Sequence, residues 1–297
     1  MWFASGERQA GRIMQQMQGD VLKSVRTVAN YEAALAKVAE WQKAEHAAGR
    51  EGGDLQSLTK EQAVSYLEQR GEQIGQKALD QERLAIQKMQ QHVTGKLEAK
   101  EKLPVVKSEL QKIEESRAYT REQINAIVER QSEKNALATQ IAHSAGLRAH
   151  ELLTLRPASE RPADERPSRE EKFNSREGER YTVVGKGGLC REVQIHRDLA
   201  QRLENTRLSE PRSVTDRGVH YTQHYNIGGG QRFSNSFSQA SHSALGKSNG
   251  AHGLRHSYAQ ERVGELQRAG LSYRNALETV SQEMGHFRPD ITEVYLR

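Results

Sequence analysis

The last residues of the chain include two types that can act on a phosphodiester. His286 directly follows Gly285, and Tyr295 lies nine residues after His286. A tyrosine hydroxyl has an ordinary pKa of about 10, so it attacks phosphorus only where a base or a strongly electropositive site removes its proton. A histidine can orient the phosphate or the nucleophile by donating a hydrogen bond. Since a lone histidine is more often structural, the spacing of further residues has to carry the interpretation.

Two arginines precede this pair in contexts that suit phosphate binding. Arg148 follows Gly146, a residue typical of a helix end, and Arg255 follows His252 by three positions. Guanidinium groups bind phosphate oxygens bidentately and stay charged at any working pH. His252 and Arg255 would share one helix face, and His252 could take or pass a proton near neutral pH. In a chain with 44 lysines and arginines, Arg255 alone would be interpreted as a solubilising surface residue.

Lys186 lies in the run Gly-Lys-Gly-Gly between two short β-branched segments, residues 181–184 and 192–195. This pattern predicts a β-hairpin with Lys186 near its tip, where it could protonate a leaving 5′ oxygen. The same run is also an ordinary charged turn, and it lacks the order of a phosphate-binding P-loop. No group of His, Asp and Glu has metal-ligand spacing, and Cys190 is the only cysteine. We therefore expect neither a metal nor another cofactor.

The first third of the chain predicts a small helical module. Apolar residues recur at helical spacing over 25–45, a capping box at Thr59 and Gln62 opens a second helix, and a third follows over 74–93. This pattern fits an oligomerisation or spacer module as well as a DNA-binding one. The expected divisions are a loosely ordered N-terminal arm (1–18), a helical module (19–95), a linker (96–117) and a catalytic domain that carries the candidate residues (118–297).

The catalytic domain is expected to be mainly α with a small β-hairpin or sheet, an α+β arrangement. A polar stretch over 157–180 predicts an exposed, mobile insertion. A short final helix capped by Asp290 should carry Tyr295. Further helices are predicted from Thr120, over 136–144, 151–155, 198–206, 235–245, 254–269 and 272–284.

Composition limits the class of protein. The chain has 297 residues, 35% of them hydrophobic and 28% charged, and contains no apolar run long enough to span a membrane. The single cysteine favours a reducing cytoplasm. The net charge is only +5, but no Asp or Glu occurs between Asp216 and Glu261. Such a stretch suits a polyanion, although a Ser/Gly-rich loop without carboxylates is an equally simple explanation.

Four short segments, one of them Gly185–Gly188 with Lys186, together resemble the tyrosine recombinase (phage integrase) family. Ala145–Arg156 is similar to the family's first arginine box, including an acidic residue, Glu151, three positions after the arginine. His252–Ala259 is similar to the second box, and Gly285-His286 with Tyr295 matches the closing box in order and spacing. The resemblance extends over residues 20–297, through motifs in the catalytic half and only in general architecture in the helical half.

The resemblance implies a site-specific recombinase that forms a two-domain clamp on double-stranded DNA. Tyr295 would attack the phosphate to form a 3′-phosphotyrosyl link, with no metal or ATP. Four protomers would exchange strands through a Holliday junction to integrate or excise a mobile element, with an accessory directionality factor as a further possible partner. The implied roles are phosphate binding by Arg148 and Arg255, proton transfer by His252, protonation of the leaving group by Lys186, and support from His286 and Glu151.

Two features depart from the family pattern. Only Leu296 and Arg297 follow Tyr295, where family members usually have a segment that docks on a neighbour, and the polar insertion stands where a first strand is expected. The small N-terminal half favours a simple recombinase over an integrase that needs distant arm sites. Two alternatives stay open: a type IB topoisomerase-like nicking and religating enzyme, and a catalytically silent DNA-binding protein.

Overall fold

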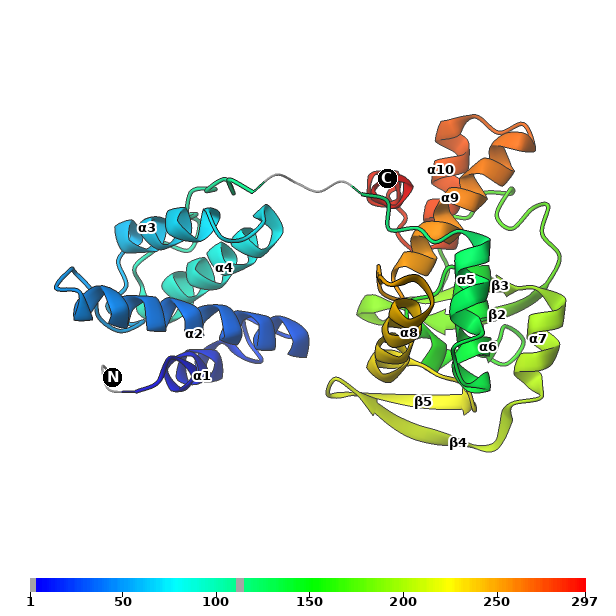
Figure 1. Cartoon of the computed structure of the whole chain (residues 1–297), viewed down its shortest axis with the longest axis horizontal. Coiled ribbons are helices and arrows are strands. Elements are labelled where there is room, and N and C mark those ends of the chain that lie inside the picture. The colour runs from blue at the N-terminus through cyan, green and yellow to red at the C-terminus, as the bar shows by residue number, and fades with distance from the viewer. Residues whose placement is uncertain (1–3, 111–114) are drawn as a thin grey trace. The chain divides into compact units, whose positions relative to one another are not determined.

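The computed structural model describes residues 4–110 and 115–297, and of Lys186 the backbone alone. The chain folds into two compact units, Met1–Ile113 and Glu114–Arg297. Figure 1 shows a helical first unit and a second unit that combines helices with two small sheets. Within the described residues, no helix is both long enough and apolar enough to cross a membrane.

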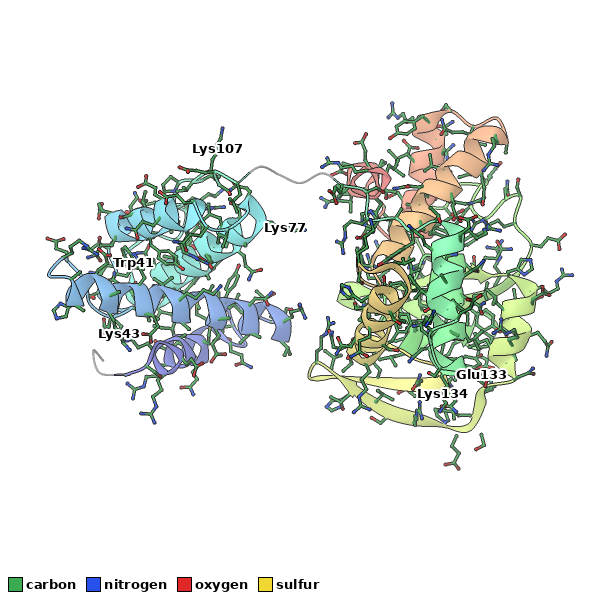
Figure 2. The ribbon with its side chains drawn as sticks, in the orientation of Figure 1. Trp41, Lys43, Lys77, Lys107, Glu133 and Lys134 are labelled. Carbon is green, nitrogen blue, oxygen red and sulfur yellow. The ribbon has the colours of Figure 1, made fainter. Side chains whose placement is uncertain are left out.

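The first unit is built on α-helices. Thr59 caps one of them through a complete capping box with Gln62, as the sequence predicts. Apolar side chains from the helices meet in one core, while Lys77 and Lys107 point away from the ribbon into solvent (Figure 2). The described helices are α1 (Gly6–Met17), α2 (Val25–Ala47), α3 (Lys60–Gly71) and α4 (Gln76–Met89), followed by a π turn (Gln90–Thr94).

The expected loose arm over 1–18 is not seen in the described residues, which form α1 instead. Ala10, Ile13 and Met17 of α1 are fully buried in the core of the first unit. Their spacing is that of one helix face, which the polar glutamines between them obscured in the sequence. The expected linker also begins too early, because Leu97 and Leu103 are buried in the same core.

The second unit contains two antiparallel sheets. The first has the order β1-β2-β3, with Val184 opposite Cys190 next to the turn, and so confirms the predicted hairpin around Lys186. The second sheet pairs β4 with β5, and the sequence analysis missed it entirely. The strands are β1 (Arg156–Pro157), β2 (Glu179–Val184), β3 (Cys190–Ile195), β4 (Arg207–Asp216) and β5 (Val219–Tyr225).

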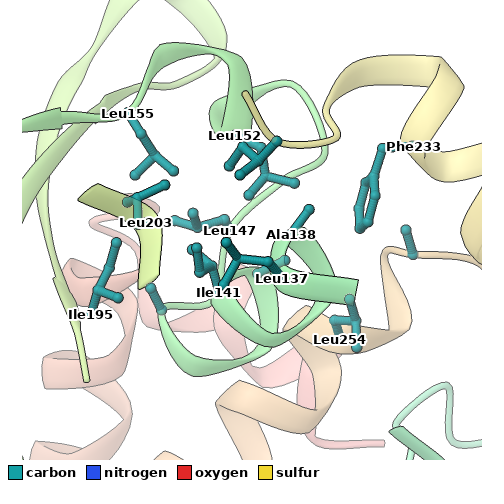
Figure 3. Packing of buried hydrophobic residues seen from close by; sticks show 14 of the residues in the cluster. Leu137, Ala138, Ile141, Leu147, Leu152, Leu155, Ile195, Leu203, Phe233 and Leu254 are labelled. Carbon is teal, nitrogen blue, oxygen red and sulfur yellow. The ribbon is translucent and has the colours of Figure 1, made fainter. Parts of the chain in front are cut away.

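The helices of this unit form around a shared core. Figure 3 shows Ile141 of α6 and Leu147 packed together with Ile195 of β3 and Phe233 of α8. A smaller cluster joins α9 to α10 through Val263 and Val280. The helices are α5 (Arg121–Val128), α6 (Glu133–Ser144), α7 (Arg197–Glu204), α8 (Gly230–Leu245), α9 (Gly253–Arg268), α10 (Tyr273–Glu283) and α11 (Pro289–Glu293), with 3₁₀ turns at Glu151–Thr154, Lys186–Gly188 and Val294–Leu296.

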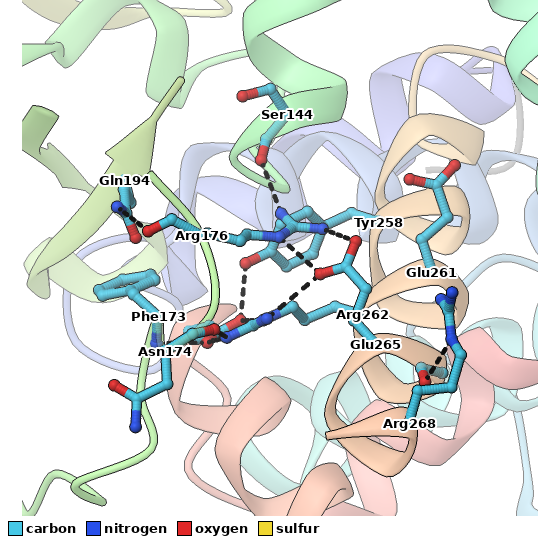
Figure 4. Close-up of polar contacts among 12 residues, drawn as sticks. Ser144, Phe173, Asn174, Arg176, Gln194, Tyr258, Glu261, Arg262, Glu265 and Arg268 are labelled. Atoms are coloured by element: carbon cyan, nitrogen blue, oxygen red, sulfur yellow. Dashed lines mark hydrogen bonds and ion pairs between the residues drawn. The ribbon is translucent and has the colours of Figure 1, made fainter. Parts of the chain in front are cut away.

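Three local expectations differ from the structure. The segment 157–180 is exposed over much of its length, but Phe173 is buried and Arg176 bonds to Glu265 of α9 (Figure 4), so the insertion is anchored rather than loose. The predicted helix over 151–155 is a short 3₁₀ turn. Tyr295 follows α11 in a separate 3₁₀ turn, and α11 begins after Arg288 rather than at Asp290, with proline in its first turn.

Candidate active site

The corner after α6 positions Arg148. Gly146 has a φ of +60°, and the backbone N–H of Leu147 donates to the Ala142 carbonyl to close the helix. A Cβ at Gly146 would lie 2.6 Å from the Tyr258 ring, so the position excludes side chains for steric as well as conformational reasons. The Arg148 side chain is 23% exposed, which leaves its guanidinium within reach of a ligand.

Glu151 is the fixed anion that supports this corner. Its buried carboxylate accepts hydrogen bonds from the Arg148 backbone N–H and from Arg148 Nη1, both at 2.8 Å. Arg191 Nη2 also donates to it at 2.8 Å, and Arg255 Nη1 lies 3.8 Å away. Burial alone would raise the pKa of Glu151, but the guanidinium groups of Arg191, Arg255 and Arg148 hold that pKa far below its usual value. Glu151 is therefore ionised, and the hydrogen bonds that it accepts hold Arg148 and Arg191 in place.

Arg255 enters the site from the first turn of α9 and is fully buried. Its guanidinium donates to the carbonyls of Gly146 and Met284, and to His286 Nε2 at 3.0 Å. Its Nε has no hydrogen-bond partner among the described residues. Burial and the charge of Arg148 lower the pKa of Arg255 to about 10. A buried cation that shares one carboxylate with two other guanidinium groups is stabilised by an added anion.

His286 is held between Arg255 and Thr292. Because Arg255 Nη2 can only donate, His286 Nε2 is the acceptor of their hydrogen bond, and Nδ1 then carries the proton that it shares with Thr292 Oγ1 at 2.9 Å. Burial and the nearby charge of Arg255 lower the pKa of His286 to about 3, which keeps the ring neutral. The sequence analysis expected His286 to donate a hydrogen bond to the phosphate or the nucleophile; in the structure its Nε2 accepts from Arg255 and its Nδ1 contacts Thr292.

Tyr295 lies beside His252, His286 and Arg255. Its hydroxyl is 3.1 Å from His252 Nε2, and the Arg255 guanidinium carbon lies 5.6 Å from its ring centroid. Surrounding protein atoms and the charge of Arg255 hold the pKa of His252 well below its usual value. A neutral His252 can accept the hydroxyl proton, so the geometry is that of a nucleophile paired with a base.

Two further residues of this site were missed in the sequence analysis. Arg191 of β3 is buried and donates to both Glu151 and the Glu283 carbonyl, the latter at 2.6 Å. His256 is buried one helical turn after His252, and its ring centroid is 4.6 Å from that of Tyr295. The i,i+4 spacing from His252 could have indicated His256. No local signal marked Arg191, because its partners are distant in sequence.

The turn that carries Lys186 lies beside the Arg148–Glu151 pair. A Cβ at Gly185 would be 3.3 Å from Glu151 Oε1 and 3.9 Å from Arg148 Nη1. Gly187 and Gly188 both have positive φ, which a tight turn of this form requires. The Lys186 side chain itself lies outside the described residues, so its expected role stays a prediction.

The site as a whole has an excess of positive charge. Three guanidinium groups surround one carboxylate, that of Glu151, which leaves a net charge of +2 before any ligand is bound. Both Arg191 Nε and Arg255 Nε are buried donors without a partner among the described residues. In the part of the chain that the structure describes, no group of three or more His, Cys, Asp or Glu could hold a metal ion. This charge pattern suits an anion such as a phosphodiester.

Comparison of the sequence with protein-family models and with curated proteins finds no match. Solved structures do match. The XerH site-specific recombinase, bound to a palindromic difH substrate, has a TM-score of 0.62 at 16% identity; the match covers 99% of this chain and 93% of XerH. The chain has the fold of the tyrosine recombinases.

Two other proteins support the same assignment of fold. A lambda integrase tetramer bound to a Holliday junction has a TM-score of 0.60 at 13% identity, covering 97% of this chain and 76% of that one. The Tn1549 transposon integrase in complex with transposon right end DNA has a TM-score of 0.56 at 12% identity, covering 99% and 95%. This tyrosine-recombinase fold is the mainly α architecture, with a small sheet beside the active-site corner, that the sequence predicts.

Proposed function

We propose that the protein is a site-specific tyrosine recombinase of the integrase type, which cuts and rejoins double-stranded DNA through a 3′-phosphotyrosyl intermediate. One observation carries the proposal: Tyr295 Oη lies 3.1 Å from His252 Nε2, beside a buried cluster with more positive than negative charge. A nucleophile, a base and an anion site therefore occupy one place. The similar proteins, described as recombinases and integrases bound to DNA, support the same choice.

The proposed cleavage step balances with the residues of this chain. Tyr295 Oη attacks phosphorus while its proton passes to His252, and the bond between phosphorus and the 5′ oxygen breaks. Arg148 and Arg255 bind the non-bridging oxygens, and Arg255 Nε gains the acceptor that it lacks. Lys186 protonates the leaving oxygen. The energy of the broken bond is kept in the phosphotyrosyl link, so a 5′ hydroxyl can reverse the reaction without metal or ATP.

The wider function follows from the same proposal. We assign the helical unit, with residues 19–95 at its centre, to core binding on DNA, and residues 118–297 to catalysis. Four protomers on two DNA sites would exchange strands to integrate or excise a mobile element in the cytoplasm, with a directionality factor as an accessory partner. Lambda integrase on a Holliday junction and Tn1549 integrase on a transposon end motivate this assignment by analogy.

The test is a denaturing-gel assay for a protein–DNA adduct, on attachment-site DNA or a randomised duplex pool, with EDTA present. We expect an EDTA-resistant adduct with wild type and with Tyr273→Phe, an exposed tyrosine on α10 that serves as the matched control. Tyr295→Phe should form none. An adduct undiminished in Tyr295→Phe would refute the assignment. Exchange of strands between two duplexes then separates a recombinase from a topoisomerase-like enzyme, which would only relax or nick one.

A further inference from the structure

A second basic pocket adjoins the candidate active site, and the reaction above leaves most of it unused. It has a volume of about 700 Å³ and lies between the corner after α6, the β2–β3 turn and strand β5. That volume is within the range of small-molecule sites, roughly 300 to 1,000 Å³. Three arginines line it, and no described lining residue is acidic. The arginines are Arg148, Arg156 and Arg161.

Two of these arginines have only neutral hydrogen-bond partners. Arg156 Nε donates to His224 Nε2 at 2.9 Å. Arg161 donates to the hydroxyl and carbonyl of Thr182 and to the Thr154 carbonyl, at 2.6 to 3.0 Å. Burial lowers the pKa of His224, and the charge of Arg156 lowers it further, so that ring stays neutral. The pocket therefore keeps two cationic groups that no carboxylate among the described residues neutralises through an ion pair.

Glu151 pairs with the lining residue Arg148, and two other carboxylates near the pocket are engaged away from it. Asp216 Oδ1 accepts the backbone N–H of Gln231 at 2.7 Å, at the start of α8. Glu160 is paired with Arg207. Neither carboxylate contributes to the lining. The positive charge of the pocket is thus available to an anionic ligand.

Two aromatic side chains, Tyr221 and His150, also line the pocket. Tyr221 of β5 is partly buried, and its ring centroid lies 6.3 Å from that of His150. A nucleobase stacks on such rings with little dependence on sequence, and arginines beside them bind the phosphate. The combination of cations and aromatic rings without carboxylates is the chemistry of a nucleotide site.

We propose that this pocket binds one nucleotide of a DNA strand, with its phosphate on Arg156 and Arg161 and its base against Tyr221. The pocket shares Arg148 with the cleavage site and is bordered by Gly185, Gly187 and Gly188 of the turn that carries Lys186. The bound nucleotide is therefore the one that leaves with the free 5′ hydroxyl, an assignment that rests on the proposed function. Holding it would keep the cleaved end close to the phosphotyrosyl link.

The pocket is tested by binding in a Tyr295→Phe background, which needs no cleavage. The probe is a short deoxythymidine oligonucleotide with one central 2-aminopurine, whose fluorescence is quenched when it stacks. We expect Tyr221→Leu to abolish the quenching and weaken binding about tenfold. Arg156→Met should weaken binding by a similar factor. Tyr273→Leu and Arg274→Met are the matched controls, because both change exposed α10 side chains that do not line the pocket.

The outcomes of these binding experiments test the pocket independently of the proposed recombinase activity. Loss of quenching and affinity in the two pocket variants, with both controls unchanged, supports the site even if wild type forms no DNA adduct. Unchanged binding and quenching in the pocket variants would overturn it, as would no binding of the oligonucleotide at all. Equal affinity for free thymidine monophosphate would also overturn it, because the site would then serve a free nucleotide rather than a strand. If the wild-type protein forms the DNA adduct, the Tyr221→Leu variant should also religate the DNA severalfold more slowly than wild type.

Discussion

The second unit contains two largely buried clusters of arginine and glutamate that differ in charge balance. The first has three arginines for one glutamate, and the second has two of each. We call the first the cleavage cluster, made of Arg148, Glu151, Arg191 and Arg255. We call the second the scaffold cluster, made of Arg176, Arg262, Glu265 and Glu283.

The scaffold cluster is satisfied internally. Arg262 is fully buried and donates to both carboxylate oxygens of Glu283, and Arg176 forms a fork with Glu265 at 2.7 and 2.8 Å (Figure 4). Burial alone would lower the pKa of Arg176 and of Arg262, but their hydrogen-bonded carboxylates raise both. None of these four side chains has an orphaned polar atom in the described structure. Such a cluster ties α9 and α10 to the insertion and has no need of a ligand.

The cleavage cluster lacks this balance. Its burial is similar, but Arg191 Nε and Arg255 Nε have no partner, and the pKa of Arg255 is lowered rather than raised. Because three guanidinium groups share one carboxylate, part of their buried positive charge is not neutralised, at a cost in stability that a bound anion would offset. The difference between the two clusters teaches that charge balance, rather than burial or arginine content, separates a binding site from a structural network.

The largest expected effect on stability comes from the scaffold cluster. Arg262→Met leaves Glu283 buried without its main cation, so we expect a loss of about 3 to 5 kcal/mol in the free energy of unfolding. Urea denaturation measures it, with exposed Arg274→Met as the control that should change stability by less than about 0.5 kcal/mol. Per folded molecule, the rate of adduct formation should not change. A large loss of that rate without loss of stability would remove the distinction between the clusters.

The largest expected effect on chemistry comes from the cleavage cluster. Arg255→Lys keeps a positive charge but loses the planar fork, so we expect adduct formation to slow about 10²- to 10³-fold. Stability should fall by about 1 to 3 kcal/mol, because the carbonyls of Gly146 and Met284 and the Nε2 of His286 lose the guanidinium donors. Single-turnover gels and urea denaturation on the same sample measure both. Near wild-type cleavage in Arg255→Lys would show that bidentate phosphate binding is not needed there.

These two clusters also show what the sequence could predict. Arg148 with Glu151, and His252 with Arg255, are three residues apart, so their association follows from helix geometry. Arg191 contacts Glu151 and the Glu283 carbonyl across 40 and 92 residues, and no local pattern encodes such a pairing.

Outside the clusters, the two hairpins and helix α1 likewise show that local sequence patterns predict some elements and miss others. The β2–β3 hairpin was predictable because β-branched runs flank a glycine turn. The β4–β5 hairpin was missed although Val214 and Thr215 precede an Arg-Gly turn, because most of β4 is exposed and lacks an apolar face. Helix α1 was missed because glutamines separate its buried apolar residues. Tertiary burial, rather than local propensity, decides these cases.

Within the cleavage cluster, a smaller effect on the cleavage rate should show whether Arg191 positions Glu151 or binds the DNA phosphate itself. Arg191 touches Glu151 rather than the reacting atoms, so Arg191→Met should slow adduct formation about 10- to 100-fold without changing DNA affinity. Arg191→Lys should restore part of the rate, since it can still pair with Glu151. Loss of DNA affinity parallel to loss of rate would instead show that Arg191 binds the substrate directly.

The smallest effect is on pH dependence. The pKa of His286 is about 3 when folded and about 6.5 when unfolded, so below pH 6.5 the unfolded chain binds more protons and stability falls as pH falls. Allowing for partial exposure, we expect His286→Gln to remove about 1 kcal/mol of the stability difference between pH 7 and pH 5. Urea titrations at the two pH values measure it. An unchanged difference would mean that His286 takes up protons over this range to the same extent in the folded and the unfolded protein.

The most direct measurement is the identity of the residue that becomes joined to DNA. The adduct is digested with nuclease and trypsin, and the peptide of residues 275–297, in which Tyr295 is the only tyrosine, is sequenced by mass spectrometry. We predict that Tyr295 carries a nucleotide 3′-phosphate. A nucleotide on any other residue, or on a 5′-phosphate, would contradict the account.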